Sequence, residues 1–424
     1  MLDRSRPSYR ELEEITVQTD TRDILSHATR QSESYEDYFL VDIDAHVSET
    51  QFWSEIIDLI DNDVIRHMGQ SMFTKPGEKS AGLTDGSTAL LNHVPGMTYQ
   101  PLYGRIPHQT GLLESVEGAR CHHFTELARR GMDAMGLDYQ IVFPTPMLAL
   151  GMHPQEEVEV ELGKAYNRWA TERIFPEDPR LKGLLYLPFN SPDACIEEVL
   201  RYADDPNIIG YTISSTRNRP VHHNRYARLY SVIEETGKPL AWHAGFTWGD
   251  PSFAQLNRFI SVHALSFVHF SLIHVTNWIM NAMPERFPKL KCIWVESGCA
   301  WIPYLMQRLD HEYMMRTCEA PGLKKMPSEY MRDMFYTTQP LERNNMKLLQ
   351  STMEACNAES QFLFASDWPH WDFDPPSAIT SLPFLSEQAK RNILGLNAAR
   401  LFNLEVKRMR PSAKSVLASR PGIS

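Results

Sequence analysis

The sequence lacks the features that mark membrane, nucleic-acid-binding and secreted proteins. No stretch of 18 consecutive apolar residues is present, so no membrane-spanning helix is expected. No run of five or more basic residues occurs and the formal net charge is -11, which argues against nucleic acid or an anionic membrane as a partner. The N-terminus, MLDRSRPSYRELEEITVQTD, is polar and acidic and lacks the apolar core of a secretory signal.

Cysteine is scarce and dispersed. None of the six cysteines forms a CxxC pair, a spacing typical of redox and structural metal sites. This pattern favours reduced thiols and a cytoplasmic location over a disulfide framework. The residues concerned are Cys121, Cys195, Cys292, Cys299, Cys318 and Cys356.

Short apolar runs are abundant, and their spacing predicts the fold. Eight such runs are mostly rich in β-branched or aromatic residues and are bounded by polar, Gly or Pro positions, as buried parallel strands are. Helical patterns lie between several of them, at 155–174, 193–202, 225–236 and 389–402. Alternating strands and helices predict an α/β protein, and eight units predict closure into a (β/α)₈ TIM-like barrel. The runs are 39–43, 139–143, 183–187, 208–213, 239–242, 291–295, 334–338 and 362–365.

The barrel is expected to occupy residues 37–404, between two polar ends. Residues 1–36 are charged and weakly periodic, and we predict an N-terminal arm that packs on the domain or a partner subunit, or is partly disordered. Residues 405–424 are predicted to be a C-terminal tail, with a mobile segment at 411–424.

Two long connections are predicted around the barrel. The stretch 65–120, after the first strand, is rich in Gly, Pro and Ser and has little periodicity, so we predict an insertion that covers the active-site face. A second excursion, at 244–285 after the fifth strand, carries many aromatic and His residues. These would suit either a pocket wall or a helix packed on the core.

Polar residues stand at the carboxyl ends of four predicted strands. The first strand runs into Asp44 and His46, the fifth into His243, the sixth into Glu296 and the eighth into Asp367. In an α/β barrel these ends meet on one rim, where active sites form. We therefore expect these residues to lie together, although they are far apart in the sequence.

Four of these residues, Asp44, His46, His243 and Asp367, form a mixed nitrogen and oxygen ligand set. Such a set suits one divalent cation, with Zn²⁺ preferred and Mn²⁺ or Fe²⁺ as alternatives, more than Ca²⁺. A bound cation could activate a water molecule and polarise a carbonyl group. Each residue alone could equally be a hydrogen-bonded structural group. Their matching positions at strand ends favour the metal site.

Acid–base chemistry has three candidates. Asp367 could shuttle a proton as well as bind the metal. Glu296 could act as a general base, or could orient a ligand histidine. His274 is an alternative acid or base, although a lone histidine is often structural. Glu49 could bond to backbone or to metal-bound water.

Substrate binding is predicted at Arg217, His370 and Trp248. Arg217 could hold a substrate carboxylate in a bidentate contact, although it and Arg219 could also be solvated loop charges, which we favour. His370 could face the pocket or stabilise the loop after the eighth strand. Trp248 lies in the aromatic-rich excursion, which suits a bulky apolar or aromatic substrate.

The segments that carry these residues resemble the amidohydrolase superfamily, and within it the amidohydrolase-related branch. That branch includes aminocarboxymuconate semialdehyde, resorcylate and carboxyvanillate decarboxylases. The resemblance spans roughly residues 39–404 and implies the same barrel, one Zn²⁺ or Mn²⁺ ion and a homodimer. It maps the family's metal ligands onto Asp44, His46, His243 and Asp367. The matching segments are VDIDAHVSE (41–49), PLAWHAG (239–245), ERFPKLKCIWVESGCAWIPYLMQRLD (285–310), FASDWPHWDFD (364–374) and NAARLFNL (397–404).

The sequence departs from that branch at two positions. Asp44 replaces the first His of the more familiar HxH pair, and the decarboxylases tolerate a carboxylate there. Glu296 stands where the decarboxylases usually carry a catalytic His at the end of the sixth strand, which puts the decarboxylase assignment in doubt.

Three functions follow, in this order. Glu296 favours a hydrolase that uses a metal-activated water on a C–N, C–O or C–C bond of a small, aromatic or cyclic substrate. The family resemblance favours the alternative, a non-oxidative decarboxylase of an aromatic or conjugated carboxylic acid. A non-catalytic scaffold that binds a partner ranks third, because the complete metal set argues against it.

Overall fold

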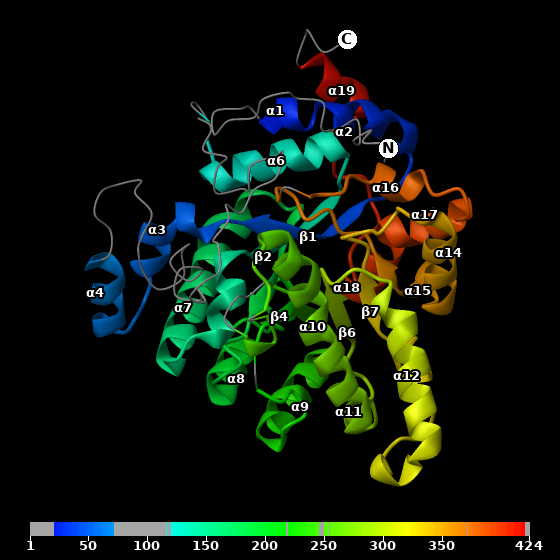
Figure 1. Cartoon of the computed structure of the whole chain (residues 1–424). Helices are drawn as coiled ribbons and strands as arrows, with labels where there is room; N and C mark the ends of the chain where they lie inside the picture. The colour runs from blue at the N-terminus through cyan, green and yellow to red at the C-terminus, as the bar shows by residue number, and fades with distance from the viewer. Residues whose placement is uncertain are drawn as a thin grey trace.

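Eight parallel strands form one sheet in sequential order, β1 to β8 (Figure 1). The computed structural model describes residues 21–71, 116, 120–217, 219–245, 250–253, 255–370 and 372–419. The strands are β1 (Val41–Val47), β2 (Tyr139–Pro144), β3 (Leu181–Tyr186), β4 (Ile208–Ser214), β5 (Leu240–His243), β6 (Cys292–Val295), β7 (Phe335–Thr337) and β8 (Phe362–Leu363). All eight predicted runs form strands, and the predicted (β/α)₈ barrel is confirmed.

The barrel closes between β1 and the segment that follows β8. Ile43 N donates to Phe364 O at 3.0 Å, and His46 N donates to Trp368 O at 2.9 Å. One core cluster draws apolar residues from all eight strands and therefore fills the barrel interior. A second, larger cluster packs the outer strand faces against the surrounding helices.

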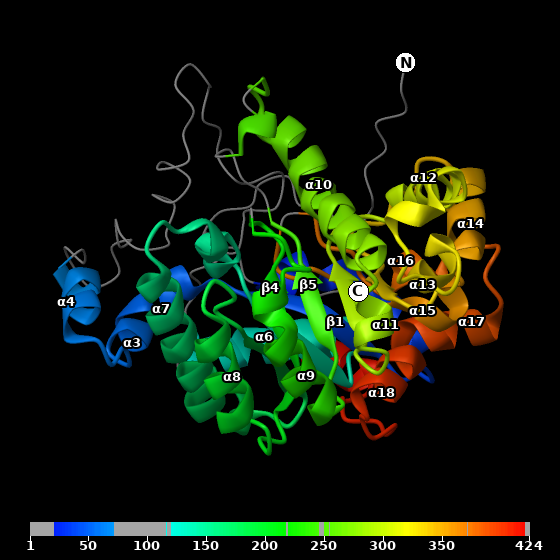
Figure 2. The same ribbon diagram turned by 90° about the horizontal axis from the view of Figure 1, so that it is seen from below.

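Helices surround the strands and connect them in sequence (Figures 1 and 2). In the described part of the chain the α-helices are α1 (Thr21–Ile24), α2 (Ser26–Gln31), α3 (Trp53–Ile57), α4 (Asp63–Ser71), α6 (His123–Met135), α7 (Glu156–Trp169), α8 (Pro192–Arg201), α9 (Ala227–Thr236), α10 (Phe259–Met280), α11 (Met283–Arg286), α12 (Trp301–Met315), α13 (Pro327–Met331), α14 (Met346–Ala355), α15 (Ala358–Gln361), α16 (Ser377–Thr380), α17 (Glu387–Arg391), α18 (Asn397–Phe402) and α19 (Ala413–Ala418).

An irregularity in β1 bears directly on the functional site. Its pairing with β2 shifts register between Asp42 and Ala45. Side chains alternate along a regular strand, so Ile43 and Asp44 would otherwise face opposite sides. Here Ile43 joins the interior cluster, and Asp44 also meets His243 of β5 across the barrel. The irregularity lets one strand supply both apolar core and polar site residues.

The excursion predicted at 244–285 contains α10, a helix of 22 residues that runs beside β5 (Figure 2). Its later turns pack on the barrel wall, where the Trp278 ring lies 5.8 Å from the ring of Trp242 in β5. The excursion is expected to form either a pocket wall or a helix packed on the core, and these turns of α10 match the second alternative. Among the residues that the structure describes, no helix is long and apolar enough to cross a membrane.

The insertion predicted at 65–120 begins within α4. From 72 onward to 120, the structure describes only residues 116 and 120. The predicted cover over the active-site face therefore lies outside the described residues.

The C-terminal segment, predicted to be a tail, contains a helix within its described residues. Residues Ala413–Ala418 form α19, which packs against α2 and α6. The physical reason lies just before this helix, at the buried guanidinium of Arg410. It donates to Glu36 O at 2.8 Å, to Tyr38 O at 2.9 Å and to Gly136 O, and it pairs with Asp138 at 3.1 Å. These bonds tie the C-terminal segment to the N-terminal arm and to the start of β2.

The Arg410 cluster should contribute strongly to stability. We expect Arg410→Met to lower the free energy of unfolding by about 3 kcal/mol, because the buried Asp138 carboxylate would lose its ion-pair partner and several buried carbonyl groups would lose their donor. Urea unfolding measures this change. Arg408→Met is the matched control, since Arg408 is exposed and pairs with Glu36 at the surface, and a loss under about 1 kcal/mol is expected there. Equal losses of unfolding free energy in the two variants would contradict a special role for the Arg410 cluster.

Candidate metal centre

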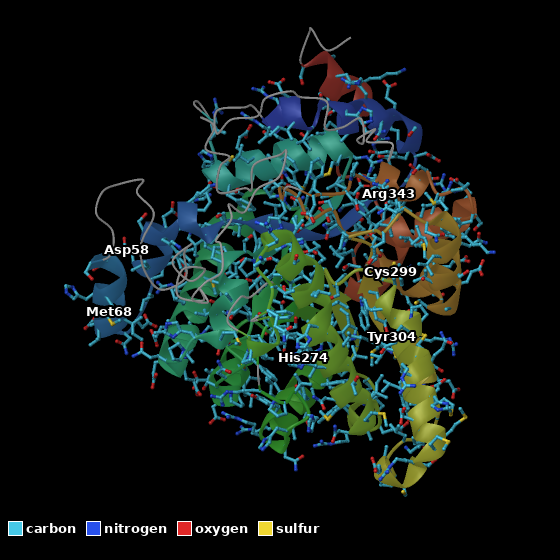
Figure 3. All side chains as sticks on the ribbon, in the orientation of Figure 1. Asp58, Met68, His274, Cys299, Tyr304 and Arg343 are labelled. Carbon is cyan, nitrogen blue, oxygen red and sulfur yellow. The ribbon has the colours of Figure 1, made fainter. Side chains whose placement is uncertain are left out.

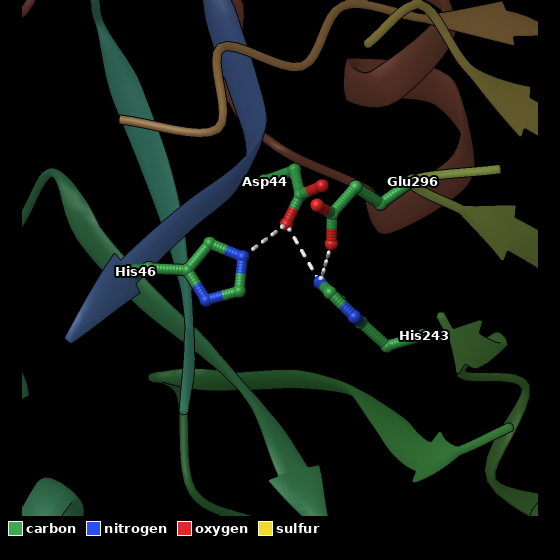
Figure 4. Close-up of side chains that lie close together, drawn as sticks. All are labelled: Asp44, His46, His243 and Glu296. Carbon is green, nitrogen blue, oxygen red and sulfur yellow. Dashed lines mark hydrogen bonds and ion pairs between the residues drawn. The ribbon is translucent and has the colours of Figure 1, made fainter. Parts of the chain in front are cut away.

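Four side chains from three strands meet at the carboxyl end of the barrel (Figure 4). β1 supplies Asp44 and His46, the last residue of β5 is His243, and Glu296 directly follows β6. Asp44 Oδ1 lies 3.3 Å from His46 Nε2 and 3.1 Å from His243 Nε2. Nε2 of His243 is also 3.7 Å from Glu296 Oε2. All four residues are at most 3% exposed, so the group is shielded from solvent.

Asp367 approaches the same group from the loop after β8. Its Oδ1 is 3.2 Å from His46 Nε2 and 2.6 Å from His370 Nδ1. Its second carboxylate oxygen accepts the side-chain N–H of Gln339 at 3.2 Å. The structure thus brings all four predicted ligands together. His46 is shared between the group that contains Glu296 and the group formed with Asp367 and His370.

Backbone carbonyl groups fix the protonation of both imidazoles. His46 Nδ1 lies 3.1 Å from Pro144 O, and His243 Nδ1 lies 2.6 Å from Ala244 O. A carbonyl oxygen only accepts, so both Nδ1 atoms carry a proton, and a ring that holds no second proton presents a lone pair at Nε2. Both lone pairs face the oxygen Oδ1 of Asp44, which is itself electron-rich. This arrangement is repulsive unless a positive charge lies between the groups.

The donor atoms fit a divalent cation. In the described part of the chain, His46 Nε2, Asp44 Oδ2 and Glu296 Oε2 are buried and have no hydrogen-bond partner. Donor atoms that bind one cation at about 2.0–2.2 Å stand about 3 Å apart, close to the separations in this site. Imidazole nitrogen and carboxylate oxygen are ligands that Zn²⁺, Mn²⁺ and Fe²⁺ accept.

Carboxyl groups crowd this buried site, and their pKa values reflect the crowding. Burial, followed by the charges of Asp44 and Asp372, raises the pKa of Glu296 well above its usual range. Burial, followed by the charge of Glu296, raises the pKa of Asp367 in the same direction. Burial also acts upward on the pKa of Asp44, but without a metal ion the positive charge and hydrogen bonds of proton-bearing imidazoles, His243 first, outweigh it and hold the pKa at about 2. A cation bound by Asp44 and Asp367 would favour the ionised form of these two carboxyl groups.

Two of the site residues adopt a backbone conformation that costs energy. Glu296 has φ of 55° and Asp367 has φ of 58°, in the left-handed region that residues other than glycine avoid. Hydrogen bonds hold both in place: Glu296 N donates to Thr337 Oγ1 at 2.9 Å, and Asp367 N donates to Asp44 O at 2.7 Å. Strain of this kind gathers at functional sites, so the conformation supports a functional role for both carboxyl groups.

His274 lies on α10 (Figure 3) and does not belong to either group of metal-ligand atoms. Its Nε2 is 2.8 Å from Ser215 O, and its ring packs near Trp242, which belongs to the outer core cluster. Burial lowers the pKa of His274 to about 4, so the ring is neutral. These contacts anchor α10 to the end of β4 and give no support to the predicted acid–base role.

The surroundings of Arg217 give no support to a substrate contact. The side chain is 1% exposed, and its guanidinium forms a buried ion pair with Glu159 at 3.3 Å. Trp248 lies outside the described residues. His370 does reach the site, where its ring centroid is 4.2 Å from that of His46.

Two polar residues beside the cluster are absent from the sequence-based prediction. Thr145 Oγ1 lies 3.1 Å from His46 Nδ1 and 3.3 Å from His370 Nε2, and Gln339 holds Asp367. Both residues stand just past the ends of predicted strands, the second and the seventh. The signal that revealed the other ligands, a polar residue at a carboxyl strand end, also marks these two.

Comparison with known proteins places the chain in a family. A family model described as amidohydrolase matches residues 41–404. The chain belongs to the amidohydrolase family. It is therefore an enzyme of the amidohydrolase superfamily, and the resemblance drawn from the sequence is confirmed.

Two curated relatives are similar to this amidohydrolase along much of its length. The gamma-resorcylate decarboxylase of Rhizobium sp. (strain MTP-10005) is 22% identical over 289 residues, which are 65% of this chain and 85% of the relative. The 2-amino-3-carboxymuconate-6-semialdehyde decarboxylase of Dictyostelium discoideum is 20% identical over 272 residues, which are 63% of this chain and 74% of the relative.

Two solved structures share the barrel fold. The 5-carboxyvanillate decarboxylase of Sphingomonas paucimobilis has a TM-score of 0.61 and 22% identity, and covers 87% of this chain and 100% of its own. The dihydroxybenzoic acid decarboxylase of Polaromonas sp. JS666 has a TM-score of 0.59 and 17% identity, and covers 87% of this chain and 97% of its own. The second structure contains bound manganese and the inhibitor 2-nitroresorcinol.

The hydrolase prediction is wrong. It rested on Glu296, which stands at the end of the sixth strand in place of the expected His. The similar proteins described above are decarboxylases, so the comparisons support the alternative reading instead. A single changed residue beside a metal cluster does not identify the reaction, because a carboxyl group can donate a proton as well as accept one.

Strain at position 296 can be measured directly. We expect Glu296→Gly to be more stable than Glu296→Ala by about 1 kcal/mol, because glycine adopts a positive φ without a Cβ clash. Denaturant unfolding of the two variants gives the difference. The same pair at Ser297, which is not among the residues with positive φ, is the control and should show alanine as the more stable residue. If the Glu296→Ala variant is as stable as the Glu296→Gly variant, or more stable, the backbone at position 296 is not strained.

Proposed function

We propose that this protein is a metal-dependent, non-oxidative decarboxylase of an aromatic or conjugated carboxylic acid. The observation that carries the proposal is a buried cluster of metal-ligand atoms on a chain whose described relatives are decarboxylases. In the proposed reaction the bond between the substrate carbon and its carboxylate breaks. The electron pair stays on that carbon, which takes up one proton, and carbon dioxide leaves.

We assign the metal site to Asp44, His46, His243 and Asp367. The two Nε2 lone pairs and the carboxylate oxygens around them support this assignment. A divalent cation bound there would attract the substrate carboxylate and stabilise the negative charge that develops on the substrate. The ion is proposed to be Zn²⁺, as expected from the ligand set, or Mn²⁺, which the similar Polaromonas structure contains.

Glu296 is assigned as the proton donor. Burial and the neighbouring acidic charges favour its neutral, proton-bearing form. Its carboxyl oxygen lies 3.7 Å from His243 Nε2, so a substrate bound at the proposed metal site would lie beside it. After the transfer, Glu296 is left ionised and regains its proton from solvent. The strained backbone at Glu296 supports a role in the reaction rather than in stability.

One apolar ring beside the cluster, that of Phe143, suits the loss of a charged group. The ring of Phe143 in β2 lies 4.6 Å from that of His243 and 6.1 Å from that of His46. A substrate carboxylate beside this ring gives up solvation by water, whereas carbon dioxide is uncharged and loses little there. Contact with this ring therefore favours loss of the charged group.

Further features stay proposals. His370 and Trp248 are proposed to contact the substrate, and the insertion at 65–120 to cover the site. The chain is proposed to act as a cytoplasmic homodimer, with residues 1–36 as an arm and residues 405–424 as the C-terminal segment. Light scattering of the purified protein gives its subunit number.

The reaction class can be tested with a panel of hydroxylated benzoates and the protein loaded with Mn²⁺ in D₂O. We expect one carbon dioxide for each product molecule, with one deuterium on the carbon that carried the carboxylate. A parallel reaction in H₂¹⁸O should give an organic product without ¹⁸O. Incorporation of ¹⁸O into that product, without carbon dioxide, would point to hydrolysis and refute the proposal.

Variants separate proton donation from metal binding. Glu296→Gln should keep one metal ion per chain and lose about 10²–10⁴-fold in kcat, the range for a lost general acid. His243→Ala should lose the metal together with activity, because it removes an imidazole ligand. Elemental analysis and carbon dioxide release measure both quantities. Near-normal turnover by Glu296→Gln would remove Glu296 from the proposed mechanism.

A further inference from the structure

We infer that Thr145 positions the metal centre, by a single hydroxyl group that lies between the rings of His46 and His370. This inference rests on the proposed metal site. Thr145 directly follows β2 and lies on the rim where the other site residues meet. Its Oγ1 is 3.1 Å from His46 Nδ1 and 3.3 Å from His370 Nε2. One side chain thus contacts the rings of both histidines that touch Asp367.

The protons in this contact run in one direction. Pro144 O can only accept, so His46 Nδ1 carries a proton and Thr145 Oγ1 is an acceptor toward it. The hydroxyl proton of Thr145 then points elsewhere, and His370 Nε2 is within reach. A His370 ring that accepts at Nε2 carries its own proton at Nδ1, which lies 2.6 Å from Asp367 Oδ1. The series of hydrogen bonds thus ends at Asp367, whose Oδ1 accepts the proton of His370 Nδ1.

The hydrogen bonds at both ends of this series, at His46 and at Asp367, favour a bound cation. At His46, a proton held on Nδ1 leaves the Nε2 lone pair directed at the cluster. At Asp367, a donor on Oδ1 favours the ionised carboxylate, which a metal ligand must be. Groups that orient metal ligands in this way contribute strongly to affinity, and their loss typically weakens binding by about 10–100-fold.

A buried carboxyl group holds Thr145 in place. Glu49, which is fully buried, accepts the backbone N–H of Thr145 at 2.9 Å and that of Met147 at 3.2 Å. Glu49 lies three residues after His46, in the short helical turn that follows β1, so the ligand and the group that fixes its partner are close in sequence. Two groups of Thr145 therefore tie the loop after β2 to β1 and the turn that follows it: the backbone N–H bonds to Glu49, and the hydroxyl group contacts His46.

The test is the affinity for Mn²⁺, measured by equilibrium dialysis without substrate. Thr145→Val keeps the shape and removes the hydroxyl, and we expect affinity about 10–100-fold weaker than wild type. Thr145→Ser keeps the hydroxyl and removes a methyl group, and should stay within about threefold of wild type. Thr145→Ala, smaller than both, should match the valine variant and serves if valine prevents folding.

Valine or alanine variants that bind Mn²⁺ as tightly as wild type would overturn the inference. A serine variant as weak as the alanine variant would also overturn it, because the hydroxyl would then not be the decisive group. The measurement is independent of the reaction. If wild-type protein binds Mn²⁺ but releases no carbon dioxide, only the proposed decarboxylation is refuted. If wild-type protein binds no Mn²⁺, both the metal site and the role of Thr145 are refuted.

Discussion

Electron-rich atoms are packed against one another at the carboxyl end of this barrel. The Nε2 lone pairs of His46 and His243 both face Asp44, and Glu296 and Asp367 add two further carboxyl groups, all in a buried place. Such a set is unfavourable without a compensating positive charge. The fold accepts this cost, together with left-handed backbone at Glu296 and Asp367. A bound cation is the simplest single feature that accounts for all of it.

The rest of the structure serves to hold these groups in position. The register shift in β1 brings apolar and polar residues of one strand to the same interior. Backbone carbonyls at the carboxyl ends of β2 and β5 hold the protons on Nδ1 of the two imidazoles, and Gln339 and His370 hold Asp367. Groups that orient ligands can matter nearly as much as the ligands themselves.

Sequence patterns predict the barrel well because each of its strands is a short buried apolar run. They also bring Asp44, His46, His243 and Asp367 to one rim, since the carboxyl ends of parallel strands converge. They do not reveal which partner a single polar residue contacts. Arg217 pairs with Glu159 and His274 bonds to Ser215 O, and both partners are distant in sequence. The order and packing of α19 escape prediction for the same reason, since they depend on Arg410 meeting carbonyl groups from the other end of the chain.

The most direct test of this account is the metal content of wild-type protein purified without added metal, measured by elemental analysis and repeated after dialysis against Mn²⁺ or Zn²⁺. The account predicts about one Mn or Zn per chain, either as purified or after dialysis, at a site that competes with a chelator. Protein that contains no metal and takes up neither ion would contradict it. The converging lone pairs would then have to be satisfied by protons, and the buried cluster would be structural.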